Sequence, residues 1–120
     1  MINIVLYNPQ IPPNTGNIMR LCANTGFSLH IIEPLGFPLD DKSLKRAKLD
    51  YFSNINPTIH KNYKSFIDVI DDKRIYAVTK YGTRIYTEIK YDKDIFLLFG
   101  SETNGLPNVI LSKLKNRSIK

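Results

Sequence analysis

Four residues that could bind an anion or a ribose lie close together in the stretch IPPNTGNIMRLCANTG, residues 11 to 26: Asn14, Gly16, Asn17 and Arg20. The prolines before them fix φ, Asn14 or Thr15 can cap a helix, and Gly16 lets a ligand approach the backbone. Free N–H groups at a helix start favour negative charge, so a guanidinium beside them could bind a phosphate or a developing alkoxide. An ordinary capped helix with a surface arginine has the same pattern, and these residues alone leave both interpretations open.

A second candidate segment, GSETNGLP, runs from Gly100 to Pro107. It contains two glycines, the acid Glu102, and two residues that can cap a turn or helix, Ser101 and Thr103. Asn104 and Gly105 can supply a turn, and the proline suits the start of a following helix. The pattern indicates either a ligand-binding loop or a strained turn.

The elements that must position these segments follow from the hydrophobic pattern. We predict strands at 2–7, 29–33, 74–79 and 94–99, and helices at 15–25, 42–49, 63–70 and 107–114. Residues 54–60 are ambiguous, and 80–93 are expected to form a loop. The alternation indicates one α/β domain with a mainly parallel sheet, in which ligands bind beyond the carboxyl ends of the strands. That rule selects residues 8–16, 79–82 and 100–107.

Composition limits the function classes. The net charge of +6 favours polyanionic partners, and the predicted helix 42–49 carries four of the cations: Lys42, Lys45, Arg46 and Lys48. That basic face is either an RNA contact or a solvated surface. The single cysteine, Cys22, suggests a small buried residue, and His30 and His60 lack the spacing of metal ligands, so no metal is expected. Without a membrane-spanning run or signal peptide, we expect a cytoplasmic protein.

Common nucleotide and hydrolase motifs are absent from the sequence. There is no Gly-x-Gly-x-x-Gly after the first strand, no Gly-Lys-Ser/Thr loop and no Gly-x-Ser-x-Gly elbow. These absences disfavour dinucleotide, nucleoside triphosphate and serine-hydrolase chemistry.

With both segments quoted, the chain resembles the SPOUT class of knotted RNA methyltransferases, and within it the small bacterial tRNA 2′-O-methyltransferases that act on the wobble nucleotide of leucine tRNAs. Three segments carry the resemblance in order: NIVLYNPQIPPNTGNIMRLCANTGF, LHIIEPLGFPLDDKSLKRAKLDY and LLFGSETNGLP. It implies a Rossmann-like α/β fold with a trefoil knot, a homodimer, and transfer of a methyl group from S-adenosyl-L-methionine to a ribose 2′-hydroxyl in the tRNA anticodon stem-loop.

The resemblance also implies roles for particular residues. Arg20 matches the arginine used at the reacting ribose, and Asn14 matches the motif residue beside it. The methyl donor is expected at Val78 and Thr79 and at the loop from Gly100 to Gly105. Glu102 either shapes that loop or the donor site, or complements a helix dipole.

The family normally continues beyond the position of Lys120, and residues 117–120 resemble the opening of a strand. We therefore expect residues 1–120 to be a single methyltransferase domain that is incomplete at its C-terminus and lacks the knot-forming part. The alternatives to an active enzyme are a non-catalytic, basic RNA-binding domain and a decaying remnant of the methyltransferase.

Overall fold

A computed structural model describes residues 2–37, 57–79, 94–114 and 117–119. Within them the elements are, in chain order, β1 (Ile2–Tyr7), α1 (Pro12–Thr25), β2 (Ser28–Ile32), β3 (Thr58–His60), α3 (Tyr63–Val69), a 3-10 turn (Asp72–Arg74), β4 (Ile75–Val78), β5 (Ile95–Phe99), α4 (Asn108–Lys113) and β6 (Ser118–Ile119). No helix in the described part is long and apolar enough to cross a bilayer.

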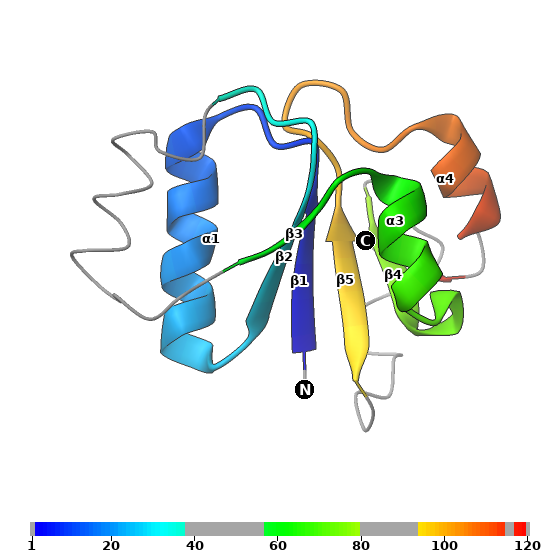
Figure 1. The fold of residues 1–120 in the computed structure, drawn as a ribbon, viewed down its shortest axis with the longest axis horizontal. Helices are drawn as coiled ribbons and strands as arrows, with labels where there is room; N and C mark the ends of the chain where they lie inside the picture. The colour runs from blue at the N-terminus through cyan, green and yellow to red at the C-terminus, as the bar shows by residue number, and fades with distance from the viewer. Residues whose placement is uncertain (1, 38–56, 80–93, 115–116, 120) are drawn as a thin grey trace.

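The strands form one sheet in the order β3-β2-β1-β5-β4-β6, and every described pairing is parallel. The central strand β1 pairs with β2 on one side and with β5 on the other, with Leu6 opposite both Ile31 and Phe99. Helix α1 covers one face of the sheet, and α3 and α4 lie on the opposite side (Figure 1). This arrangement confirms the predicted α/β class with a parallel sheet.

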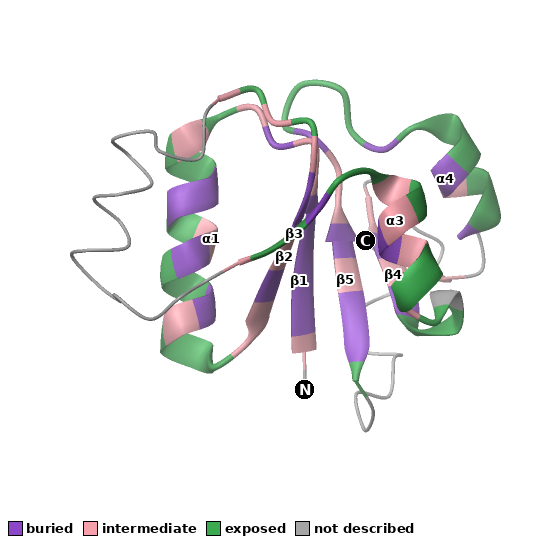
Figure 2. Ribbon diagram, in the orientation of Figure 1, coloured by how far each residue is buried: buried purple, intermediate pink, exposed green. Residues whose placement is uncertain are grey.

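Each face of the sheet has its own apolar core. On the α1 side, Met19 and Cys22 pack with Ile4, Leu6 and Ile31. On the other side Phe66 of α3 and Ile110 of α4 pack against a second set from the strands: Val5, Ile32, Ile75, Ala77 and Leu98. Figure 2 shows the central strands β1 and β5 largely buried, and the outer sides of the helices exposed. Burial on both faces explains why the central strands read as continuous apolar runs.

The start of α1 differs from its prediction. The helix begins at Pro12, three residues earlier than expected, and its N-cap is Ile11, whose side chain makes no capping hydrogen bond. The assignment of Asn14 or Thr15 as the cap is therefore wrong. Proline has no N–H to leave unsatisfied and its fixed φ suits a first helical turn, while the residue before a proline is held extended, as Ile11 is with φ −113°.

Other predictions agree with the structure to within a few residues, and two fall elsewhere. The ambiguous segment 54–60 supplies the edge strand β3, and the expected strand after residue 117 is present as β6. The predicted helix 42–49, with its four cations, and the predicted loop 80–93 lie outside the described residues.

Candidate functional site

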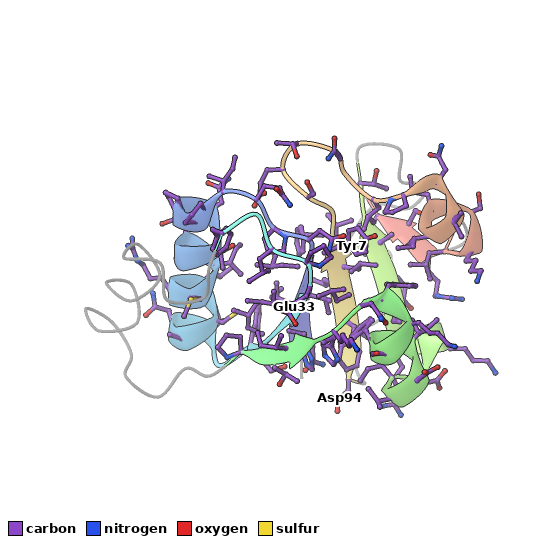
Figure 3. The ribbon with its side chains drawn as sticks, turned by 45° about the horizontal axis from the view of Figure 1, so that its top comes forward. Tyr7, Glu33 and Asp94 are labelled. Carbon is purple, nitrogen blue, oxygen red and sulfur yellow. The ribbon has the colours of Figure 1, made fainter. Side chains whose placement is uncertain are left out.

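The site lies where parallel strands end. The loops that follow β1 and β5 come together beyond the carboxyl ends of these strands (Figure 1), because the two strands are neighbours. In Figure 3, Tyr7 at the end of β1 and Glu33 after β2 lie toward this end of the sheet, and Asp94, just before β5, lies at the other. Two clefts open here, and both are bordered by Phe99, Gly100 and Glu102.

The larger cleft has a volume of about 620 Å³. Its lining combines Val78 and Thr79 at the end of β4, the loop after β5, and Leu111 of α4. The backbone N–H of Thr79 donates to Ile119 O at 2.9 Å, so β6 supports this wall. The cleft therefore brings together Val78, Thr79, Gly100 and Gly105, the residues at which the family resemblance implies the methyl donor.

The loop after β5 is held by its own hydrogen bonds. Ser101 Oγ accepts from the backbone N–H groups of Thr103 and Asn104, each at 3.2 Å, and Ser101 O accepts from Gly105 N at 2.8 Å. Gly105 adopts φ +67°. A Cβ on Gly100 would lie only 2.5 Å from the Leu106 nitrogen and 2.7 Å from Gly105 Cα, so glycine is required there. The loop is both a constrained turn and a wall of the larger cleft.

The loop after β1 is also held in place by hydrogen bonds. Asn8 adopts φ +47°, which asparagine tolerates, and its Nδ2 donates to Pro34 O at 2.9 Å. Gln10 Nε2 donates to Asn8 O at 2.9 Å, and the Gln10 backbone N–H donates to Glu102 Oε2 at 2.7 Å. The last bond joins the two loops across 92 residues of sequence.

The smaller cleft, of about 310 Å³, lies against the first turns of α1. Asn14, Thr15, Asn17 and Ile18 form its helical wall. Thr15 is fully buried, and among the described residues its Oγ1 is the buried side-chain polar atom that has no hydrogen-bond partner.

Arg20 is not among the residues that line the two clefts, and it is exposed on α1. At 100° per residue, Arg20 lies on the side of the helix away from Thr15 and Ile18, and about 60° around the helix from Asn17, one turn earlier. The structure therefore brings Asn14 to the site and does not place Arg20 against the clefts of its own chain.

The structure pairs two histidines that looked unrelated in the sequence. His30 on β2 and His60 on β3 are stacked with ring centroids 5.1 Å apart, and His30 Nδ1 lies 2.9 Å from His60 Nε2. Burial, with repulsion from His60, lowers the pKa of His30 to about 4, and burial lowers that of His60. Phe66 and Phe96 surround the pair, which lies outside the two clefts. The two histidines meet because β2 and β3 are neighbours in the sheet, so no short stretch of sequence predicts their contact.

Cys22 is buried against the sheet, as the sequence suggested, and burial raises the pKa of its thiol to about 11. A buried thiol with a raised pKa contributes to packing and is a poor nucleophile.

The larger cleft fits the methyl donor that the sequence implied. Its volume lies in the range of small-molecule sites, and it combines apolar side chains such as Val78 and Leu111 with polar groups such as Thr79. A Cβ at Gly100 would collide with the loop that forms the wall, so the cleft depends on glycine there.

Comparison with known proteins gives one consistent family. Residues 1–120 match the model of the SpoU rRNA Methylase family. The chain is 54% identical to the tRNA (cytidine(34)-2'-O)-methyltransferase of Escherichia coli K12 over 114 residues, which are 95% of this chain and 73% of that relative.

Solved structures agree with this match. One, described as giving insight into the 2-OH methylation of C/U34 on tRNA, has a TM-score of 0.91 at 36% identity and covers all of this chain and 78% of that one. An AdoMet-bound rRNA methyltransferase from Sinorhizobium meliloti has a TM-score of 0.82 at 22% identity, with 98% of this chain and 46% of that one covered, and supports the fold.

Proposed function

The chain belongs to the SpoU methylase family, and from this premise we propose that the protein transfers a methyl group from S-adenosyl-L-methionine to the ribose 2′-hydroxyl of nucleotide 34 in tRNA. One observation carries the proposal: the two clefts share Phe99, Gly100 and Glu102, so a donor in one and an acceptor in the other would meet at a common wall. The likeness to a tRNA (cytidine(34)-2'-O)-methyltransferase supports nucleotide 34 as the target.

In this proposal Val78, Thr79, Gly100 and Gly105 would hold the donor, which would supply a methyl group from a positively charged sulfur, with S-adenosyl-L-homocysteine as the leaving group. The residues at the ribose would hold the 2′-hydroxyl in line with that methyl group while the hydroxyl loses its proton. Positioning of the two groups therefore supplies much of the catalysis.

Asn14 and Arg20 are the proposed residues at the ribose. A guanidinium keeps its proton in proteins and cannot serve as a base at neutral pH, so Arg20 orients the ribose and adjacent phosphate and stabilises developing oxyanion charge. The proton passes to phosphate or water. Because Arg20 lines neither cleft of its own chain, we favour a homodimer in which Arg20 of one copy reaches the site of the other.

The proposal extends to the substrate and its compartment. Leucine tRNAs, contacted at the anticodon stem-loop, are the proposed substrates, and the cytoplasm is the proposed compartment because tRNA is modified there. The net charge of +6 suits a polyanionic substrate.

The test is methyl transfer from labelled S-adenosyl-L-methionine to tRNA transcripts, with the modified nucleotide located by mass spectrometry. We expect one methyl group on the ribose of nucleotide 34, and none on a matched tRNA that carries a 2′-deoxynucleotide at that position. Methylation of a base, or equal labelling of the deoxy control, would contradict the proposal. Tight tRNA binding without transfer would instead support the non-catalytic RNA-binding alternative.

A further inference from the structure

The bond between Glu102 and Gln10 joins the loop that borders the donor cleft to the start of the helix that borders the smaller cleft. Glu102 Oε2 accepts from the Gln10 backbone N–H at 2.7 Å. Gln10 immediately precedes the N-cap, Ile11, and α1 begins two residues after Gln10. We propose that Glu102 is a positioning residue that sets the acceptor-side helix against the donor loop.

The N-terminus of α1 has prolines in its first turn but no side chain of its own that caps it. Its N-cap side chain makes no hydrogen bond, and its first turn contains no acidic residue. Pro12 and Pro13 have no N–H, so the backbone N–H groups that directly precede the helix are those of Gln10 and Ile11. A carboxylate near a helix N-terminus is favoured by the helix dipole, and the acid comes here from the far end of the sequence.

Both partners of the bond are held in place. On one side, Glu102 lies in the loop fixed by Ser101 Oγ and Gly105. On the other, Gln10 Nε2 is bonded to Asn8 O, and Gly36 is packed so closely that a Cβ there would lie 2.9 Å from Gln10 Cα. Because both loops are held by other contacts, the bond between Glu102 and Gln10 fixes the distance and orientation of one loop relative to the other.

Glu102 acts through the backbone of Gln10, and this separates its role from that of a general base. An amide oxygen can accept the same N–H bond as a carboxylate, whereas it cannot remove a proton. Glu102→Gln therefore keeps the positioning role of this residue, whereas it would abolish a role as a general base. Shortening the side chain by one methylene in Glu102→Asp withdraws the acceptor from Gln10.

The kinetic test rests on the proposed function and compares Glu102→Ala, Glu102→Asp and Glu102→Gln with the wild-type protein. We expect Glu102→Ala and Glu102→Asp to lower kcat by about 10- to 100-fold, because small misplacements of reacting groups have effects of this size. Glu102→Gln should recover most of the lost kcat. Glu33→Ala is the matched control, since it removes a carboxylate at the same end of the sheet from a residue that lines neither cleft.

Equal loss in Glu102→Gln and Glu102→Ala would overturn the positioning role, as would wild-type kcat in Glu102→Ala. If the wild-type protein itself transfers no methyl group to tRNA, the proposed function fails, and a second measurement still tests the bond. In NMR spectra, the Gln10 amide proton should move upfield and lose exchange protection in Glu102→Ala and not in Glu33→Ala. An unchanged Gln10 resonance would show that the bond is absent in solution.

Discussion

Acidification should destabilise the protein before its carboxylates begin to titrate, because of the His30–His60 pair. The chain contains only two histidines, and the structure stacks them within one partly buried cluster. Burial, with repulsion from His60, lowers the pKa of His30 from about 6.5 to about 4. Burial also lowers the pKa of His60.

The sign follows from proton linkage. A folded-state pKa below the unfolded one means that the unfolded chain binds more protons as the pH falls through about 6.5, so stability is present above that pH. It is lost progressively until the folded state itself takes up the proton near pH 4. For His30, this linkage amounts to about 2 kcal/mol between pH 7 and pH 5. Solvent screening at a half-buried ring reduces this to about 1 kcal/mol.

The assay is urea unfolding, followed by circular dichroism at pH 7, 6 and 5. We expect the free energy of unfolding to fall by about 1 to 2 kcal/mol across this range, with His60 adding to the His30 effect. The variant His30→Phe/His60→Phe keeps flat rings beside Phe66 and Phe96 and removes both titrating groups. A flat profile for the wild-type protein, or the same slope in the double variant, would refute the reasoning.

Four further outcomes are expected. Arg20→Lys should lose most of kcat, because an ammonium lacks the planar fork of a guanidinium; near-normal turnover would contradict an orienting role. Gly100→Ala should weaken S-adenosyl-L-methionine binding in calorimetry far more than Gly105→Ala. An added Cβ at position 105 meets no atom within 4 Å, and its φ of +67° lowers the stability of the fold by about 1 to 2 kcal/mol. Equal effects on binding would argue against the close approach at Gly100. Thr15→Val should raise the free energy of unfolding in urea by up to about 1 kcal/mol, because it removes a buried hydroxyl without a hydrogen-bond partner. A decrease of similar size in the free energy of unfolding would show that the hydroxyl has a hydrogen-bond partner. Cys22 should resist a thiol reagent at pH 8 in the folded protein and react on unfolding, since burial raises its pKa to about 11; rapid native labelling would contradict its burial.

Much of the fold could be read from local pattern. The apolar runs that become β1 and β5, and the end of α1 at Thr25, are where the sequence predicts them, and Gly26 follows the helix with φ +79°. The start of α1 differs from the prediction, which places Pro12 and Pro13 before the helix, although proline fits a first helical turn. The edge strand β3 was ambiguous because three residues carry too little periodicity to separate strand from loop.

The sequence by itself determined the α/β class, the family resemblance and the two loops of the candidate site, because these depend on residues close together in the chain. Only the tertiary structure decided which distant residues meet. Glu102 bonds to Gln10 because β1 and β5 are neighbours in the sheet, and His30 stacks on His60 because β2 and β3 are. Arg20 lies outside the clefts of its own chain because of its position around α1. Strand order and helix phase are properties of the packed sheet, and no short stretch of sequence contains them.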